Sequence, residues 1–147
     1  KEADKRGLKL ADENHIDFTA DEMLQLINNV NNPNFGINLD TGNFMRLLDD
    51  PVKGAKKLAK HVMATHVKDL KPEKGLDVDN WHFFACTPVG DGLVDNQQLA
   101  QILYDNGFDG FLAVEIDYLH KDYNNDEDAA VAQSIKELDR IASNVQG

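Results

Sequence analysis

Four residues that can bind a metal ion each stand at the end of a short apolar run. They are Glu13, Asp40, His66 and Glu115. Three carboxylates placed together would repel one another unless a cation lay among them. Three oxygen donors and one imidazole suit Mn²⁺, Mg²⁺, Co²⁺ or Zn²⁺. The spacing therefore predicts a divalent metal site, although acidic residues and histidines after strands are also common as solvated loop residues.

The apolar runs that precede these residues have the length of strands. They cover residues 8–11, 35–39, 62–65 and 111–114, too short for buried helices. In parallel α/β folds the ligand chemistry lies at the carboxyl ends of the strands. The four side chains would converge there if the sheet curves.

Helix signals separate the four predicted strands. Thr19 and Glu22 form a capping-box pattern, and Asp50 precedes a proline at a predicted first helical position. Asp95 opens a third helix, which Gly107 ends in a left-handed cap. The last helix, about residues 127–145, is predicted to pack through Val131, Ile135, Leu138, Ile141 and Val145.

Strand and helix alternate four times, which predicts an α/β fold with parallel strands. The length of 147 residues favours a single domain. Residues 70–94 form a long irregular insertion, and such loops are often functional lids.

Five segments resemble the successive signatures of the xylose isomerase-like TIM-barrel superfamily. They are Asp12-Glu13-Asn14-His15, Leu39-Asp40-Thr41-Gly42-Asn43, Thr65-His66-Val67-Lys68-Asp69, Gly90-Asp91-Gly92 and Ala113-Val114-Glu115. The resemblance implies a (β/α)8 TIM barrel, of which residues 1–147 would be the last four βα units as one domain. Because the chain starts at Lys1 and not Met, we expect a fragment of a longer protein. A missing N-terminal half or a second copy would complete the barrel.

The resemblance also implies roles for individual residues. Glu13, Asp40, His66 and Glu115 would bind the metal, and Glu13 and Glu115 would also serve as the catalytic acid and base. Asn43, Lys68 and His15 would contact a small-molecule sugar or sugar phosphate.

Proton transfer next to a carbonyl is the chemistry that such a site would perform. A metal-bound enediolate is shared by aldose–ketose isomerisation and by epimerisation, which are the first expectation. Dehydration of a keto-polyol, as in inosose or 3-dehydroshikimate dehydratase, is an alternative. A non-catalytic sugar-binding or structural half-barrel is a second alternative.

Composition excludes other classes of protein. The formal net charge of −11, with no Lys/Arg cluster, argues against nucleic-acid binding. The loop before Gly90 also lacks the Asp-x-His arrangement of endonuclease IV. The single cysteine, Cys86, rules out an internal disulfide framework and predicts a cytoplasmic protein. No apolar run approaches the ~20 residues that span a membrane.

A glycine-containing turn and two further histidines are also considered as site residues. Gly90-Asp91-Gly92 could be an anion-binding nest for a sugar phosphate or a tight turn. His82 is predicted to pack in an aromatic cluster near Trp81, and His120 is predicted to be solvated.

Overall fold

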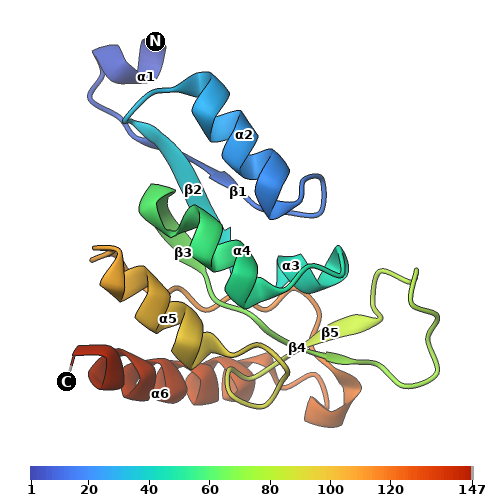
Figure 1. The fold of residues 1–147 in the computed structure, drawn as a ribbon. Coiled ribbons are helices and arrows are strands. Elements are labelled where there is room, and N and C mark those ends of the chain that lie inside the picture. Colours follow the sequence, from blue (N-terminus) through green and yellow to red (C-terminus); the bar gives the residue numbers. More distant parts are fainter. Residues whose placement is uncertain (147) are drawn as a thin grey trace.

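A curved parallel sheet carries the helices on one side. The computed structural model describes residues 1–146. Strands β1 (Leu10–Glu13), β2 (Phe35–Asp40) and β3 (Val62–His66) pair in the order β1-β2-β3, all parallel. Helices α2 (Ala20–Val30), α4 (Pro51–Leu58), α5 (Asn96–Asp105) and α6 (Glu127–Gln146) follow one another down one side of the molecule (Figure 1). This arrangement agrees with the predicted α/β class.

The register of the sheet brings the strand ends to one edge. Glu13 pairs with Asn38, and Asp40 pairs with His66. Strand β1 lies two residues later than the predicted segment 8–11, because Leu10 is the first residue that pairs with β2, opposite Phe35. Glu13 is therefore the last residue of the strand itself.

The predicted fourth strand, residues 111–114, is not a regular strand. Only one parallel bridge forms, between Val67 and Val114, flanked by hydrogen bonds from Val67 N to Ala113 O and from Glu115 N to Val67 O. Phe111 is 91% exposed, and its carbonyl accepts a hydrogen bond from the Thr65 hydroxyl at 2.7 Å, in place of a main-chain ladder bond. The bridge nevertheless places Glu115 beside the end of β3.

Local capping signals were predicted correctly. Glu22 N donates to the Thr19 hydroxyl, while the Glu22 carboxylate accepts from Thr19 N. Asp50 caps α4 by accepting from Val52 N and Lys53 N. Gly107, with φ +86°, takes the left-handed conformation after α5. Each signal depends only on neighbours in the chain.

The core lies between the sheet and the helices. Its main cluster packs β2 against α2, α4 and α5, through buried side chains that include Met23, Ile37, Leu39, Leu58 and Leu103. Leu138 and Ile141 of α6 join a second cluster. The prediction was wrong for Val131 and Ile135, which are 37% and 50% exposed. Their side of α6 has no neighbouring element among the described residues.

The insertion after β3 is not irregular throughout, contrary to the prediction. Strands β4 (Asp69–Pro72) and β5 (Phe84–Thr87) pair antiparallel within it, and residues 73–83 connect them. Cys86 on β5 is buried, as expected for a small apolar residue. The hairpin thus stands on the edge where the parallel strands end.

Short helical segments fill the connections. They are α1 (Glu2–Lys5), α3 (Asn43–Arg46) after β2, η1 (Ala59–His61) before β3, and η2 (Lys121–Tyr123) before α6. No helix in residues 1–146 is both long enough and apolar enough to cross a membrane.

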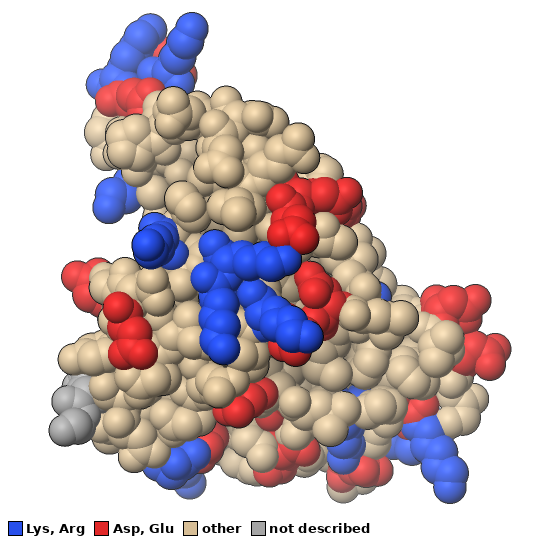
Figure 2. Space-filling model, viewed as in Figure 1, with Lys and Arg blue, Asp and Glu red and all other residues tan. Residues whose placement is uncertain are grey.

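Charges are unevenly distributed on the surface. In the same view, Figure 2 shows basic side chains gathered over α4, which carries Lys53, Lys56 and Lys57. Lys57 pairs with Asp21 of α2 at 2.6 Å, so part of this basic charge serves to join two helices.

Candidate metal centre

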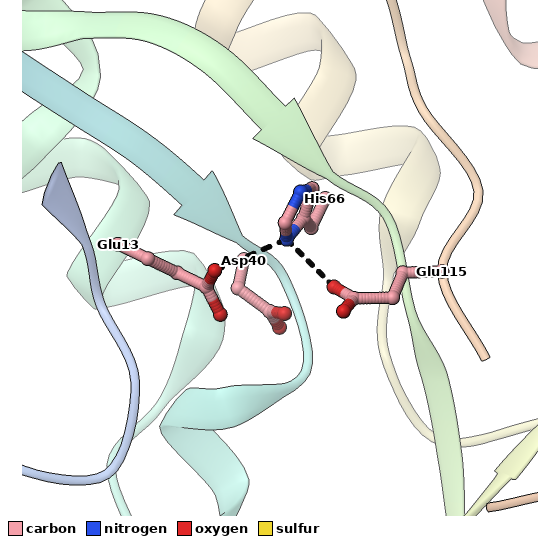
Figure 3. Close-up of side chains that lie close together, drawn as sticks. All are labelled: Glu13, Asp40, His66 and Glu115. Atoms are coloured by element: carbon pink, nitrogen blue, oxygen red, sulfur yellow. Dashed lines mark ion pairs between the residues drawn. The ribbon is translucent and has the colours of Figure 1, made fainter. Parts of the chain in front are cut away.

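The four predicted ligand residues come together in space. Each of Glu13, Asp40, His66 and Glu115 offers one donor atom, and these four atoms lie within 4.8 Å of one another (Figure 3). The first three are the last residues of β1, β2 and β3, and Glu115 follows the bridge at Val114. The convergence expected from the sequence is therefore present.

The imidazole of His66 lies between two carboxylates. Its Nδ1 atom is 2.7 Å from Glu115 Oε2 and 3.2 Å from Glu13 Oε2. These three side chains are partly accessible, whereas Asp40 is fully buried. The cluster thus opens to solvent on one side, where a small molecule can enter.

Three buried atoms of the cluster have only charged groups as near partners, an arrangement that fits a cation. Asp40 Oδ2, His66 Nδ1 and Glu115 Oε2 are buried and form no hydrogen bond with the described residues. Their contacts are ion pairs with one another or with Lys68, so a cation among them would meet donor atoms that no hydrogen bond already occupies. Three carboxylates with one imidazole form a donor set that accepts Mg²⁺, Mn²⁺, Co²⁺ or Zn²⁺.

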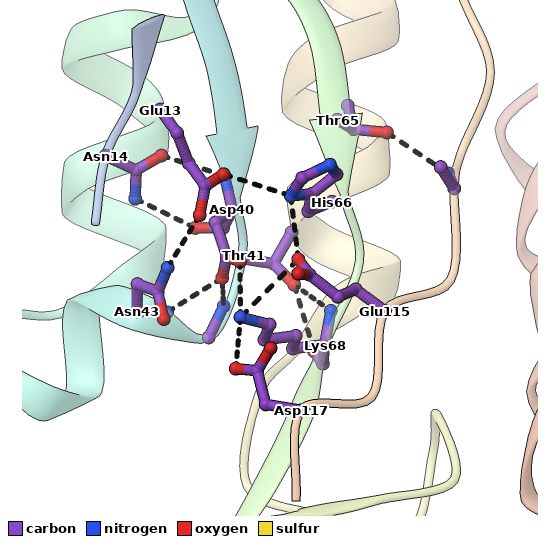
Figure 4. A network of polar contacts seen from close by, with 12 residues as sticks. Glu13, Asn14, Asp40, Thr41, Asn43, Thr65, His66, Lys68, Glu115 and Asp117 are labelled. Carbon is purple, nitrogen blue, oxygen red and sulfur yellow. Dashed lines mark hydrogen bonds and ion pairs between the residues drawn. The ribbon is translucent and has the colours of Figure 1, made fainter. Parts of the chain in front are cut away.

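Neighbouring groups fix the orientation of Asp40. Its Oδ1 atom accepts hydrogen bonds from Gly42 N and Asn43 N, both at 2.9 Å (Figure 4). Asn14 bonds the main chain of Asp40 on both sides, donating to its carbonyl and accepting from its N–H. Oδ2 is therefore directed away from these donors and toward the cluster.

Asn43 and His15, both predicted to contact substrate, differ in position. Asn43 is buried, and its Nδ2 atom donates to Glu13 Oε1 at 3.1 Å. His15 is exposed on the loop after β1, with its ring 5.9 Å from that of Trp81. Substrate contact by either residue stays a prediction.

Lys68 is almost fully buried, with 2% of its side chain exposed, and lies among three carboxylates. Its Nζ atom is 2.6 Å from Asp117 Oδ2, 2.9 Å from Asp40 Oδ2 and 3.4 Å from Glu115 Oε2. Burial by itself would lower the pKa of Lys68, but the charges of Asp40 and Asp117 outweigh it and raise the pKa above its ordinary value. Lys68 is therefore a permanent cation beside the cluster, and substrate contact by this residue stays a prediction.

The carboxyl group of Glu115 holds a proton more readily than an exposed glutamate does. Burial raises its pKa above the ordinary 4.5, while Lys68 and His66 oppose this effect. Protons therefore compete with a cation at Glu115 over a higher pH range than at an exposed carboxylate.

The glycine turn after β5 is a nest, but a side chain of the protein already occupies it. Gly90 N and Gly92 N donate to Asp69 Oδ2, each at 2.9 Å, and Leu70 N and Val94 N donate to Oδ1. Burial raises the pKa of Asp69, although these four N–H groups act to lower it. The reading of this turn as a sugar-phosphate site is therefore wrong, because Asp69 supplies the anion.

Several participants were missed or misplaced by sequence reasoning. Asp117 and Asn14 were not predicted, although Asp117 stands two residues after Glu115, the spacing that puts side chains of an extended segment on one face. His120, predicted to be solvated, is buried, with Nε2 3.2 Å from Glu73 Oε2. His82 is exposed and its ring lies 4.1 Å from that of Tyr118, so its aromatic neighbour is not the predicted one near Trp81.

Comparison with known proteins now gives the family. The family model of the xylose isomerase-like TIM barrel matches residues 1–141. The chain belongs to the xylose isomerase-like TIM-barrel family. This confirms the predicted family and the half-barrel. The family contains sugar-modifying enzymes.

Relatives of the xylose isomerase-like family match this chain over about half their own length. An inosose dehydratase of Clostridium perfringens is 28% identical over 124 residues, which cover 77% of this chain and 42% of that protein. A xylose isomerase domain protein of Planctomyces limnophilus has TM-score 0.78 and 24% identity, over 98% of this chain and 48% of that one. The IOLI protein, solved with a bound zinc atom, has TM-score 0.70 and 20% identity, over 97% and 52%. The two structures show the fold alone.

Proposed function

We propose that this chain carries the metal-binding half of a divalent-metal-dependent enzyme that moves a proton next to the carbonyl of a sugar or keto-polyol. The convergence of four donor atoms from Glu13, Asp40, His66 and Glu115 within 4.8 Å carries the proposal. The zinc in the solved IOLI protein supports a divalent ion in this fold.

Asp40 and His66 would mainly hold the ion, with Glu13 and Glu115 completing the donor set. A bound divalent ion would act as a Lewis acid toward a substrate carbonyl and a neighbouring hydroxyl. Lys68 offsets part of the negative charge of Asp40, Glu115 and Asp117. The cluster would therefore carry less excess negative charge when the divalent ion is bound.

Glu13 and Glu115 would divide the proton transfers. They approach His66 from opposite sides, Glu13 from β1 and Glu115 from the segment that bridges to Val67 through Val114 (Figure 3). One carboxylate takes the proton from the carbon next to the carbonyl, and the C–H electron pair becomes the double bond of an enediolate. The other returns a proton to carbon or to oxygen. Return to carbon gives epimerisation or isomerisation.

Dehydration is the second candidate, favoured by the similarity to an inosose dehydratase. The first proton transfer is the same. The enolate then re-forms the carbonyl and expels a β-hydroxyl, which leaves as water after protonation by the second glutamate. The product therefore distinguishes the two functions: dehydration releases water, whereas epimerisation and isomerisation do not. The same metal centre would serve both.

Two measurements test the proposal. The first is bound Zn²⁺ or Mn²⁺ by elemental analysis of wild type, His66→Ala and the control His61→Ala. We expect metal in wild type and His61→Ala and little in His66→Ala; equal, negligible metal in all three would favour a non-catalytic module.

The second measurement uses a protein that also contains the other half-barrel. It follows the entry of solvent deuterium into carbon positions of ketoses and keto-polyols. No exchange across that panel would contradict the enolate step.

A further inference from the structure

Glu115 lies on a less regular segment than the other three candidate ligands. Those three end regular strands, whereas Glu115 follows an isolated bridge between Val67 and Val114. The Glu115 N–H group donates to the Val67 carbonyl at 3.1 Å, and this bond anchors the segment on β3. A side chain that must bind a metal ion is held in place only when the backbone that carries it is fixed. The segment beyond Glu115 therefore needs a second anchor.

The insertion after β3 provides that second anchor. Cys86 N on β5 donates to the Tyr118 carbonyl at 2.7 Å, and the Cys86 carbonyl accepts from His120 N at 2.8 Å. These two bonds form a parallel bridge to β5. Glu115 and Asp117 lie between this bridge and the one on β3. The β4–β5 hairpin thus holds the far end of the stretch that carries both carboxylates.

A buried pair of side chains reinforces the second anchor. His120 and Glu73 are both buried, and Nε2 of His120 lies 3.2 Å from Oε2 of Glu73, where the β4–β5 connection begins. Nδ1 of His120 accepts a hydrogen bond from Asp122 N at 3.2 Å, so in the neutral ring the proton lies on Nε2, the atom that faces Glu73. One nitrogen of the imidazole therefore contacts the insertion, and the other contacts η2.

Charged neighbours keep Glu73 in its carboxylate form. The side chain of Lys121 contacts Oε1 of Glu73 and lowers the pKa of Glu73 below its ordinary 4.5. Asp122 contacts Lys71 of β4 at 2.8 Å, which joins the same short stretch to the hairpin once more. A buried carboxylate is costly unless it is paired. Separation of the segment from the insertion would leave Glu73 without its partners.

We propose that His120 and Glu73 are positioning residues, whose contact fixes the segment that carries Glu115 and so sets the place of its carboxylate in the metal centre. The inference rests on the proposed function, because the effect that it assigns to the two residues is on metal binding. Neither side chain is among the four donors, so both act through Glu115. The insertion is then a fixed support of the metal centre.

Two variants at position 120 separate the two contacts of the imidazole. The side-chain amide of Gln can donate from about the place of Nε2, and the amide of Asn can accept at about the place of Nδ1. In calorimetric titration with Zn²⁺ we expect His120→Gln to bind as wild type does and His120→Asn to bind about tenfold more weakly. His61→Asn, on η1 before β3, is the matched control and should bind normally.

Variants of Glu73 test the other partner. Glu73→Gln keeps an oxygen that accepts from Nε2 and should bind Zn²⁺ as wild type does. Glu73→Met removes the acceptor and should show the same loss as His120→Asn. In the metal-free chain, the amide hydrogens of Cys86 and His120 should exchange faster in Glu73→Met than in wild type, because the bridge to β5 opens more often.

A double-mutant cycle tests whether the effect passes through Glu115. Glu115→Gln removes one ligand charge and weakens Zn²⁺ binding by itself. When His120→Asn is added to Glu115→Gln, we expect a further change of less than about twofold. An equal tenfold loss in both backgrounds would overturn the proposal, because a general loss of structure does not depend on Glu115.

Separate outcomes distinguish the two proposals. Failure of Zn²⁺ to bind to wild type, or binding that does not depend on His66, would contradict the proposed function and this inference with it. Binding that depends on His66 but is unchanged in both His120→Asn and Glu73→Met would overturn the positioning role alone.

Discussion

Lys68 Nζ lies 2.9 Å from Asp40 Oδ2, a fully buried contact directly behind the metal centre. The same ammonium group contacts Glu115 and Asp117, so one cation serves three carboxylates (Figure 4). Removing one partner of a buried ion pair leaves its charge uncompensated, which is far more costly than losing a surface pair.

Lys68→Met should therefore lower the free energy of unfolding by about 3–5 kcal/mol. Lys71→Met, which breaks the exposed pair with Asp122, should cost about 0–1 kcal/mol. Urea unfolding measures both. A divalent ion should stabilise Lys68→Met more than wild type, because it supplies positive charge that the variant lacks; equal losses in the two variants would contradict the assigned role of Lys68.

Asn43→Ala should weaken metal binding about 10- to 100-fold, the range seen when a group that orients a ligand is removed. The physical reason is the loss of the hydrogen bond from Asn43 Nδ2 to Glu13 Oε1. Calorimetric titration with Zn²⁺ measures the change, and Asn144→Ala, which removes a surface hydrogen bond to Gln97, is the control. Normal metal affinity combined with lost sugar binding would instead favour direct substrate contact.

Gly92→Ala should destabilise the fold by about 1–3 kcal/mol, because there is no room for a side chain. A Cβ atom at Gly92 would lie 2.1 Å from Asp69 Oδ1. Gly75→Ala makes a useful comparison: its φ of +94° is strained for alanine, but its surroundings are open, so a loss of about 1 kcal/mol is expected. Thermal unfolding compares them, and a larger loss at Gly75 would argue against the occupied nest.

Acidification should remove the contribution of the capping box. The hydrogen bond from Thr19 N lowers the pKa of Glu22 below its ordinary 4.5, so the folded state favours the charged form. This stabilisation is present above pH 4.5 and is lost as the pH falls through the lowered value. Glu22→Gln should thus have a lower urea midpoint than wild type near pH 7 and the same midpoint near about pH 3; a gap independent of pH would contradict the assignment.

Sequence reasoning succeeded where one element decides the outcome. The caps at Thr19 and Asp50 follow from adjacent residues, and the convergence of the four candidate ligand residues follows from the rule that parallel strands end on one edge. The capping signals lie within short segments of the sequence, and the convergence follows from the order of strands and helices along the chain.

Sequence reasoning failed where the structure depends on contacts between segments that are separated in the chain. The pairing of β4 with β5, the burial of His120 against Glu73 and the occupation of the glycine turn by Asp69 each join residues far apart in the chain. Val131 and Ile135 show the converse: a helical apolar stripe predicts a buried face only if something packs on it.

The two edges of the sheet, β1 and the segment from Phe111, are incompletely paired, which affects how the isolated chain associates in solution. Leu10 on the outer side of β1 is 52% exposed, and the segment from Phe111 on the opposite flank is parallel to β1 and only partly paired. Two copies that meet at both flanks would close a barrel, whereas copies that meet at one flank only leave free edges to which further copies can add. Light scattering and turbidity should therefore rise steeply with protein concentration, and dilute samples are the appropriate material for every titration above.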